Sequence, residues 1–299
     1  MGQLKPLEYY HIGNTPLIFA ESINNSNIYI KLESENFLGS VKARTGYFMI
    51  QALSDEHRSK TIIEATSGNL GFALGFLCKE ADLNFMCLID ESIAKAKLQR
   101  LREKHIRYEI VKQENGYDLR TSRIRLAQRM AADGNYYWIN QYGNDNAVQA
   151  HALTTAPEIF AQMNGKIDFC FCPMGSCGTI CGISRYLKRV LPDVKICGVE
   201  PLGSTIYAQY DAKYINAGAG LKGKPSNIIN NPDTVDMNFV VSDDEAICTS
   251  KKILKELNVS LGITSGMAYA AALKTAQNKS GVNIVVIAPD GGESYAEYF

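Results

Sequence analysis

The stretch KLESENFLGSVKAR, from Lys31 to Arg44, decides the fold of this chain. Its pattern predicts a strand at 28–33, a polar turn around Asn36, and a helix that opens at Ser40 with Lys42 in its first turn. A lysine at this place lies near helix amide donors and can be desolvated, which makes its amine nucleophilic enough to form a Schiff base. An isolated lysine is more often a solvated side chain on the outer face of a helix, so the interpretation depends on the other motifs.

Length and charge narrow the class of protein. The 299 residues suffice for one large domain or two modest ones, and 31 Lys+Arg balance 31 Asp+Glu. A net charge of zero argues against nucleic acid or an anionic membrane as the main partner. The chain contains no apolar run near the roughly 20 residues that a membrane span needs, and its first residues lack the pattern of a signal peptide. We therefore expect a cytoplasmic protein with neither a membrane nor a nucleic-acid partner.

A cluster of cysteines raises the question of a metal site. Its members are Cys170, Cys172, Cys177 and Cys181. The first two lie in the apolar run KIDFCFCPM, which predicts a buried strand, and the other two flank glycines. The cluster has neither the two-residue gap nor the second half-site that indicates a zinc ribbon. We expect buried free thiols in a reducing compartment and no bound metal.

Apolar runs alternate with amphipathic patterns along the rest of the chain. Strands are expected at 61–64, 84–89, 107–112, 167–172, 195–199, 238–241 and 283–288. Helices are expected at 69–80, 94–103, 117–132 and 179–191, after Ser242 with Glu245 spaced as a capping box, and from Ser265 onward. Such alternation predicts an α/β protein whose mostly parallel sheet is covered on both faces. A glycine-rich stretch at 203–238 is expected to be a long functional loop.

Two glycine-marked turns between a strand and a helix are suited to anions. In ATSGNLG, Thr66, Ser67 and the amides around Gly68 are expected to form a nest for a carboxylate, and Asn69 adds an amide. In GSCGTICG, at 175–182, glycines let the backbone wrap a phosphate group. The glycine spacing fits neither the dinucleotide fingerprint nor the nucleotide phosphate loop, so a single bound phosphate group is the simpler hypothesis.

Two further glycine-marked turns are also suited to binding a ligand. In GITSG, Ser265 can hydrogen-bond a ring nitrogen, although a plain helix cap explains it equally well. In AGAG, at 217–220, the glycines permit a small ligand to approach the backbone. A reactive lysine, a phosphate cradle, a carboxylate nest and a hydroxyl for a ring nitrogen are together what a pyridoxal phosphate enzyme requires.

The chain resembles the fold type II pyridoxal phosphate enzymes, specifically the cysteine synthase (O-acetylserine sulfhydrylase) group. The resemblance runs nearly end to end, through IGNTPL, KLESENFLGSVKAR, TSGNLG, QYGNDNAVQAHALTTAPEI, GSCGTICG, AGAG, GITSG and PDGGESY. Within this group, ATSGNLG and YWINQY are closer to the siderophore-pathway enzymes that join glutamate to phosphoserine, of the N-(2-amino-2-carboxyethyl)-L-glutamate synthase type. The resemblance implies a cytoplasmic homodimer of tryptophan synthase β-like fold, each chain with two domains. Residues 1–39 and 146–299 would form the larger, coenzyme-phosphate domain, and 40–145 the smaller, mobile, substrate-carboxylate domain.

The resemblance also implies a role for each matched residue. Lys42 would form the Schiff base with pyridoxal 5′-phosphate and act as acid and base on the substrate's α-proton, and Ser265 would face the pyridine nitrogen and leave it unprotonated. Asn69 would meet both the phenolic oxygen of the coenzyme and the substrate. The remaining coenzyme residues bind its phosphate: Gly175, Ser176, Cys177, Gly178 and Thr179. The remaining substrate residues are Thr66, Ser67, Gly68 and Gln141 at the carboxylate, and Asn216 and Ala217 near the amine.

Departures from the family pattern concern the pocket wall. Ala43 stands where the family has Asp, Phe37 where it has Pro, Leu70 where cysteine synthases have Thr, and Asn216 where a glycine is usual. The implied reaction expels a β-substituent from a serine derivative or cysteine to give an aminoacrylate, then adds a nucleophile. Lys222 and Lys224 in the loop that closes the site would attract an anionic substrate, but ordinary surface lysines are the preferred interpretation.

Three other functions remain open at this point. The first is the joining of glutamate to phosphoserine. The second is a serine or threonine deaminase of the same fold type, against which SGNLG argues, because such enzymes carry a run like SGNHAQ. The third is a binding relative without coenzyme, against which the intact Lys42 and phosphate loop argue.

Overall fold

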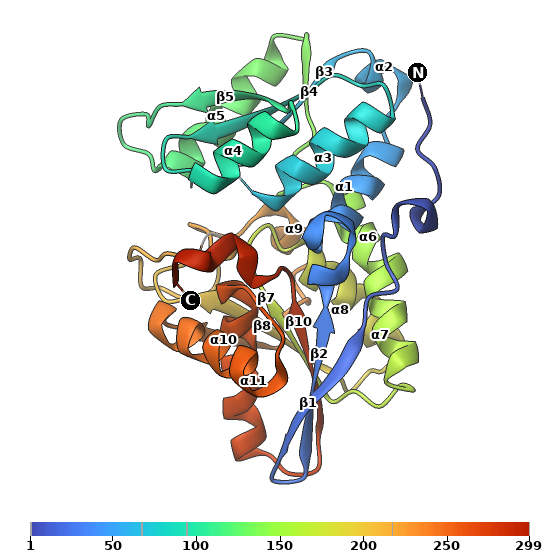
Figure 1. Ribbon diagram of the computed structural model, residues 1–299, viewed down its shortest axis with the longest axis vertical. Helices are drawn as coiled ribbons and strands as arrows, with labels where there is room; N and C mark the ends of the chain where they lie inside the picture. Colours follow the sequence, from blue (N-terminus) through green and yellow to red (C-terminus); the bar gives the residue numbers. More distant parts are fainter. Residues whose placement is uncertain (1, 67, 94, 217, 299) are drawn as a thin grey trace.

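The larger of two sheets lies in the lower half of the molecule (Figure 1). The computed structural model describes residues 2–66, 68–93, 95–216 and 218–298. Within these residues the larger sheet has six strands in the order β1-β2-β10-β7-β8-β9. They are β1 (Leu17–Ile23), β2 (Ser26–Leu32), β7 (Phe169–Pro173), β8 (Lys195–Pro201), β9 (Met237–Val241) and β10 (Asn283–Ala288). Neighbouring strands run parallel, apart from the antiparallel pair of β1 and β2.

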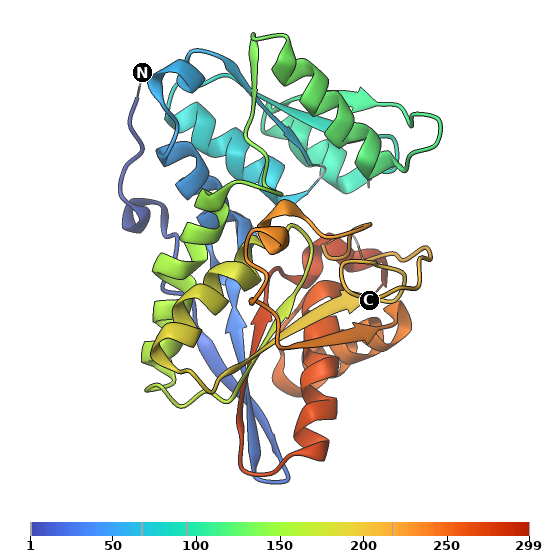
Figure 2. The same ribbon diagram turned by 180° about the vertical axis from the view of Figure 1, so that it is seen from behind.

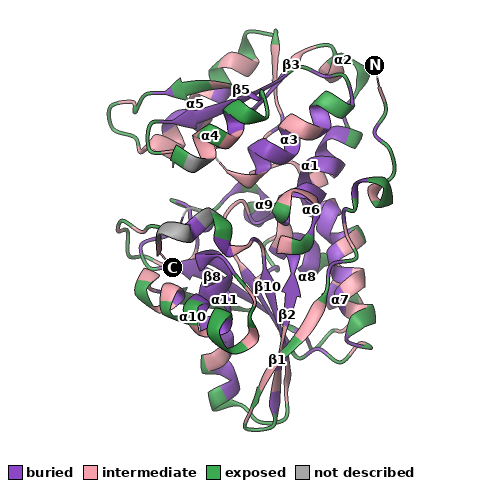
Figure 3. Ribbon diagram, viewed as in Figure 1, coloured by how far each residue is buried: buried purple, intermediate pink, exposed green. Residues whose placement is uncertain are grey.

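The smaller sheet lies in the upper half of the molecule. The described part of the chain gives it four parallel strands in the order β5-β4-β3-β6. They are β3 (Thr61–Ala65), β4 (Phe85–Asp90), β5 (Arg107–Val111) and β6 (Tyr136–Trp138). Every residue of β4 is buried, as expected for a parallel strand whose two faces are both covered (Figure 3).

Helices separate the strands along the chain. The α-helices are α1 (Lys42–Gln51), α2 (Asp55–Arg58), α3 (Asn69–Glu80), α4 (Lys95–Glu103), α5 (Leu119–Ala132), α6 (Asp145–Ala150), α7 (Ala156–Gln162), α8 (Gly178–Val190), α9 (Ser226–Ile229), α10 (Asp243–Leu257) and α11 (Ile263–Asn278). Single turns of other helix types are η1 (Leu7–Tyr10), η2 (Glu33–Glu35), η3 (Phe37–Gly39), the π-helix η4 (His151–Thr155) and η5 (Gly292–Tyr298).

Alternation of side chains along the strands creates a core on each face of both sheets. Phe171 of β7 packs with α10 and α11, whereas its neighbours Cys170 and Cys172 pack with α7 and α8. These two pairs of helices lie on opposite faces of the larger sheet (Figure 2). In the smaller sheet, Ile62 of β3 packs with α1 and α3, and Ile63 packs with α5. The four cores hold each sheet between two layers of helices, so the predicted α/β class is confirmed.

Several expected elements match and others shift. Helix α3 and strand β10 have the predicted bounds, and Ser242 caps α10 by accepting the N–H of Glu245 at 3.3 Å. Helix α1 begins at Lys42 and not at Ser40, because Ser40 is extended and pairs with Asp290. Strand β2 ends at Leu32, one residue earlier than predicted, because the chain then turns into η2.

The sequence analysis missed β1, β6 and the helical run from α6 through η4 to α7. Strand β1 is an edge strand of intermediate and exposed residues, so it lacks the apolar run that marks a central strand. Strand β6 has only three residues. The π-helical turn within the run changes the spacing of side chains and so breaks the period of an α-helix.

The two-domain division stays a prediction. Leu4, Tyr10 and Ile12 pack in the same core as α1 and α3, so the amino-terminal segment contacts the helices of the smaller sheet. A search of the described residues finds no helix with the length and apolar character of a membrane span.

Candidate active site

Lys42 is held at the carboxyl end of β10. The N–H of Val41 donates to the carbonyl of Pro289 at 2.9 Å, and Ser40 forms an isolated β-bridge with Asp290. Ligands of open α/β sheets bind beyond the carboxyl ends of the strands. The turn before α1 is therefore fixed to the part of the large sheet where a ligand is expected.

Two more predicted residues meet at the same strand end. Asn69, the first residue of α3, donates Nδ2 to Oδ2 of Asp290 at 3.1 Å. Ser265, in the first turn of α11, donates its hydroxyl to the backbone carbonyl of Asp290 at 3.1 Å. The Ser265 hydroxyl has one proton, so donating to an unprotonated ring nitrogen requires it to leave this carbonyl. Lys42, Asn69 and Ser265 are thus brought together around Asp290, although they lie far apart in the sequence.

Burial changes the protonation of the Lys42 amine. Desolvation lowers the pKa of Lys42 from its ordinary value, and the charge of Asp290 only partly opposes this effect. The residue as a whole has an intermediate exposure. A lysine with a lowered pKa carries a larger neutral fraction, which is the nucleophilic form.

The predicted phosphate loop lies between β7 and α8. Cys177 has a φ of +63°, in the left-handed region, and turns its thiol toward the carbonyl of Gly175 at 3.3 Å. A Cβ added to Gly178 would lie 3.1 Å from the carbonyl oxygen of Ala147, and one added to Gly175 would lie 3.4 Å from that of Gly218. The small residues thus let the loop pack closely at the amino end of a 13-residue helix, where N–H groups and the helix dipole favour an anion.

A buried histidine links this loop to α1. His151 lies 3.1 Å through Nε2 from the hydroxyl of Thr45 and 3.2 Å from that of Thr179, and its Nδ1 is 2.9 Å from Thr155 Oγ1. Burial lowers the pKa of His151 well below its ordinary value, and the nearby charges of Arg44 and Lys42 act in the same direction. The ring is therefore neutral and orients the Thr179 hydroxyl.

The predicted carboxylate nest is only partly described. Thr66 is buried, and its hydroxyl accepts the N–H of Gly68 at 3.3 Å. Gly68 precedes the first turn of α3 in an extended conformation. Ser67 lies outside the described residues. The described atoms place an open helix amino terminus beside Asn69, which suits a carboxylate.

Gln141 is held by a buried acid. Its N–H donates to Glu64 at 3.1 Å, and its side-chain amide points to the same carboxyl group at 3.5 Å. Burial raises the pKa of Glu64 to about 7. Asn227 then ties this segment to the phosphate loop, because its Nδ2 donates to the carbonyls of Gln141 at 2.9 Å and Ser176 at 2.7 Å.

Asn216 takes part in a buried network. Its Oδ1 accepts from Thr264 at 2.6 Å and from the N–H of Gly218 at 3.3 Å, and its Nδ2 is 3.5 Å from the sulfur of Met267. Asn216 is 1% exposed, so these partners fix the side chain that replaces the usual glycine. Ala217 lies outside the described residues.

Asp290 is a site residue that the sequence analysis did not single out. Its carboxyl is buried, and among the described atoms its Oδ1 has no hydrogen-bond partner. Burial raises the pKa of Asp290 to about 6, although Lys97, Asn69, Lys42 and Tyr295 all oppose the shift. The motif PDGGESY at the end of the last strand was the signal that could have identified it.

A second overlooked feature is a set of four charged residues, three buried and Glu158 partly exposed, which we name the Arg44 cluster: Lys31, Glu33, Arg44 and Glu158. The guanidinium of Arg44 binds Glu33 at 2.7 and 2.8 Å and Glu158 at 2.6 and 2.7 Å. Lys31 binds Glu158 at 2.8 Å. The signal available in the sequence was the presence of Lys31 and Glu33 at the end of a predicted strand and of Arg44 two positions after Lys42. The cluster fixes the helix that carries Lys42.

The loop lysines already have partners. Lys222 forms an exposed ion pair with Asp211 at 2.9 Å, and the amine of Lys224 lies 4.3 Å from the centre of the Tyr207 ring. These contacts agree with the preferred interpretation of both residues as surface lysines.

The cysteine cluster contains free and buried thiols, as predicted. The sulfurs of Cys170 and Cys172 are 3.9 Å apart, and burial raises the pKa of Cys172 well above its ordinary value. Among the described residues no group of three His, Cys, Asp or Glu side chains could hold a metal ion.

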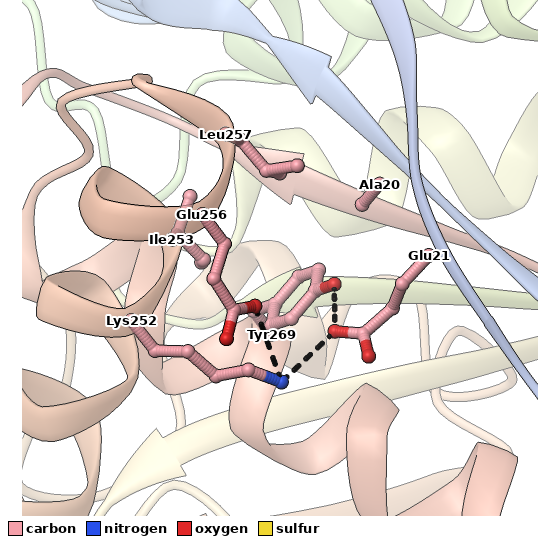
Figure 4. Close-up of a pocket in the computed structure, with 7 residues that line it drawn as sticks. All are labelled: Ala20, Glu21, Lys252, Ile253, Glu256, Leu257 and Tyr269. Atoms are coloured by element: carbon pink, nitrogen blue, oxygen red, sulfur yellow. Dashed lines mark hydrogen bonds and ion pairs between the residues drawn. The ribbon is translucent and has the colours of Figure 1, made fainter.

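A small cavity of about 10 Å³ lies away from these residues, between β1, α10 and α11 (Figure 4). Tyr269 donates its hydroxyl to Glu21 at 2.7 Å there, and Lys252 lies 3.2 Å from the same carboxylate. The cavity is too small for an amino acid and its polar groups are paired, so it does not compete with the candidate site.

Comparisons with known proteins agree with the geometry. The family model described as a pyridoxal-phosphate dependent enzyme matches residues 9–290. Cysteine synthase of Buchnera aphidicola (subsp. Acyrthosiphon pisum) is 33% identical, over 95% of this chain and 94% of the relative. Cysteine synthase A of Escherichia coli (strain K12) is 32% identical, over 95% of this chain and 91% of the relative.

Two solved structures share the fold over almost the whole chain. A hydrogen sulfide-producing enzyme from Fusobacterium nucleatum has a TM-score of 0.86 at 28% identity, covering 98% of this chain and 99% of the other. An O-acetylserine dependent cystathionine β-synthase from Helicobacter pylori has a TM-score of 0.88 at 28% identity, covering 99% and 98%.

Proposed function

The chain belongs to the pyridoxal-phosphate dependent enzymes and, within them, to the cysteine synthase family, and we propose that it replaces the β-substituent of a serine derivative or of cysteine. Its coenzyme is pyridoxal 5′-phosphate. Sulfide would be the incoming nucleophile in one direction and the leaving group in the other. The relatives named cysteine synthase and the hydrogen sulfide-producing structural neighbour support this choice.

The residues around Asp290 fit the coenzyme. When bound, pyridoxal 5′-phosphate supplies an electron sink that stabilises negative charge at the α-carbon of the substrate. The loop of Gly175, Ser176, Cys177, Gly178 and Thr179 offers a helix amino terminus to its phosphate. Lys42 would bind its aldehyde carbon, and Ser265 and Asn69 would meet its ring nitrogen and phenolic oxygen.

One observation carries the proposal. Lys42 is an amine of lowered pKa at the start of α1, in a turn tied to the end of β10 by the hydrogen bond from the N–H of Val41 to the carbonyl of Pro289, and the charge of Asp290 acts on it. This placement makes Lys42 the group that would take the α-proton of the substrate at Nζ and later return it. The other substrate contacts that we propose are Thr66, Ser67, Gly68, Asn69 and Gln141 at the carboxylate, and Asn216 and Ala217 near the amine.

The test is the variant Lys42→Ala. We expect it to fold, to lack the visible absorbance of lysine-bound coenzyme, and to lose cysteine formation from O-acetylserine and sulfide by at least about a thousandfold. The matched control is Lys60→Ala, since Lys60 forms an ion pair with the exposed Glu56 at 3.0 Å and its loss should leave turnover unchanged. Full turnover by Lys42→Ala with coenzyme bound would contradict the proposal.

A second candidate is the synthesis of N-(2-amino-2-carboxyethyl)-L-glutamate from phosphoserine and glutamate. Leu70 in ATSGNLG, together with YWINQY, favours it, because Leu70 replaces the threonine of cysteine synthases. Incubating the holoenzyme separately with O-acetylserine, phosphoserine, serine and cysteine, and then adding sulfide or glutamate, distinguishes the two candidates. Pyruvate release without an added nucleophile would instead indicate a deaminase, and a colourless protein would indicate a binding relative.

The organisation of the protein follows from the same family. We propose a cytoplasmic homodimer in which residues 1–39 and 146–299 hold the coenzyme phosphate and 40–145 form the mobile domain. The separate four-stranded and six-stranded sheets support this division. Size measurement in solution tests the dimer, with a molecular mass twice that of the 33.0 kDa chain as the expected result.

A further inference from the structure

We propose that Asp290 is a positioning residue that fixes the side-chain amide of Asn69 in the orientation required by substrate and coenzyme. The inference deepens the proposed function and rests on it, because Asn69 is the residue proposed to touch both ligands. Asn69 Nδ2 donates to Asp290 Oδ2 at 3.1 Å across 221 positions of sequence. This bond joins α3, beside the smaller sheet, to the end of β10 in the larger sheet.

The chemistry of the pair determines the orientation of the amide. An ionised carboxylate only accepts hydrogen bonds, whereas an asparagine amide has a donating nitrogen and an accepting oxygen. Asp290 therefore permits only the nitrogen of Asn69 to face it, and the amide oxygen must point elsewhere. One Nδ2 proton and the Oδ1 of Asn69 then remain for ligands, each on a defined side.

Asp290 itself is held from several directions. Its carbonyl accepts from the Ser265 hydroxyl and from the N–H of Gly262, each at 3.1 Å, and its backbone pairs with Ser40. The Tyr295 hydroxyl donates to Oδ2 at 3.4 Å. A carboxylate held in this way can serve as a fixed reference for the Asn69 amide.

Gly262 leaves space for the carboxylate of Asp290. A Cβ added to Gly262 would lie 2.5 Å from Asp290 Oδ1, so a glycine at this position makes room for that oxygen. Oδ1 is buried and lacks a partner within the described residues, while Lys42 and Lys97 act on the group through their charges. An unpaired buried oxygen, in a carboxyl group on which the charge of Lys42 acts, indicates a group that faces ligand, because packing alone would favour an apolar residue.

A double-mutant cycle tests whether Asp290 acts through Asn69. Asp290→Asn keeps the shape but can present either a donor or an acceptor, so the Asn69 amide loses its fixed orientation. With O-acetylserine and sulfide we expect KM to rise on the order of tenfold and kcat to fall less than about threefold. In an Asn69→Ala background the same substitution should change KM by less than about twofold. Independent, multiplying effects of the two substitutions would overturn the inference.

Two more variants separate positioning from general disruption. Tyr295→Phe removes the other hydrogen bond to Oδ2 and leaves the Asn69 contact, so KM should stay within about twofold of the native value. Gly262→Ala would place a Cβ 2.5 Å from Oδ1 and 2.7 Å from the ring of Tyr295 without removing the charge of Asp290, and it should raise KM in the same direction as Asp290→Asn. A Tyr295→Phe effect as large as that of Asp290→Asn would assign the role to the tyrosine and overturn the proposal.

Coenzyme affinity gives a readout that needs no substrate. Titration of the apoenzyme with pyridoxal 5′-phosphate should show weaker binding to Asp290→Asn, by several-fold, and no such difference in the Asn69→Ala background. If the native enzyme converts none of the serine derivatives, the proposed function fails while this titration still decides the role of Asp290. If the native enzyme is active and Asp290→Asn matches it in both KM and coenzyme affinity, only the role of Asp290 fails.

Discussion

Two buried polar groups near Lys42 differ in one respect, namely how far their charges are paired. In the Arg44 cluster, the guanidinium of Arg44 binds two carboxylates, and Glu158 also binds Lys31. Asp290 has one oxygen with partners and one without any among the described residues. Burying an ion is unfavourable unless partners compensate it, so a paired cluster is consistent with a structural role and an unpaired oxygen with a role toward ligand.

The largest effect is expected from breaking the paired cluster. Arg44→Met leaves the buried Glu33 without its ion partner and Glu158 with Lys31 alone, and it should lower the free energy of unfolding by about 3–5 kcal/mol. Urea unfolding of the holoenzyme at a fixed coenzyme concentration measures the change. The control Arg129→Met removes an exposed arginine that binds Glu114 at 2.6 Å, and it should cost less than about 1 kcal/mol. Equal losses in the two variants would show that the Arg44 cluster contributes no more than a surface pair.

Removing the charge of Asp290 should raise the stability of the protein, whereas breaking the Arg44 cluster should lower it. Burial raises the pKa of Asp290 from 3.8 to about 6, so between these values the native state binds more protons than the unfolded chain. Stability therefore falls as pH rises through this window, by about 3 kcal/mol at most for a shift of this size. The variant Asp290→Asn has no carboxyl group at this position that becomes charged as pH rises. Its stability relative to the native protein should therefore increase between about pH 4 and pH 8.

The pH series needs the neighbouring groups as a reference. Lys42, Lys97 and Tyr295 also interact with Asp290, so the difference between the two unfolding curves reports the ionisation of Asp290 together with its coupling to these neighbours. A difference that stays constant across the series would mean that Asp290 has an ordinary pKa. A more stable variant with a raised KM would show that this carboxylate lowers stability and supports function.

The sequence was sufficient for the fold and for most of the elements that carry the site. Parallel strands buried on both faces leave apolar runs, and for this reason β10 was predicted with its observed bounds. Helix α3 was predicted with its observed bounds from its helical pattern. Strand β1, at the edge of its sheet and only partly buried, gives no such run. The π-turn η4 places His151 against Thr45 and Thr179 by a change in helix type that side-chain periodicity does not reveal.

Candidate site residues that belong to a short sequence motif could be predicted, whereas those whose hydrogen-bond partners are distant in sequence could not. Lys42, Asn69 and Ser265 each follow a short glycine or serine turn, so each could be singled out by itself. The role that we propose for Asp290 depends on its contact with Asn69 of α3, which lies 221 positions away in sequence. Asn227 is similar, because its two carbonyl partners lie 86 and 51 positions away.

The smallest effect is expected at the surface, where charge pairing has little influence on stability. Lys222 and Asp211 are 55% and 51% exposed in their side chains, so water and salt screen their attraction. Lys222→Ala should change the free energy of unfolding by less than about 0.5 kcal/mol and leave KM unchanged for both O-acetylserine and phosphoserine. Steady-state kinetics at low and high salt measure this. A KM for phosphoserine that rises in the variant only at low salt would instead show that this loop attracts anionic substrates. The ion pair of Lys222 with Asp211 would then not exclude a role of Lys222 in binding.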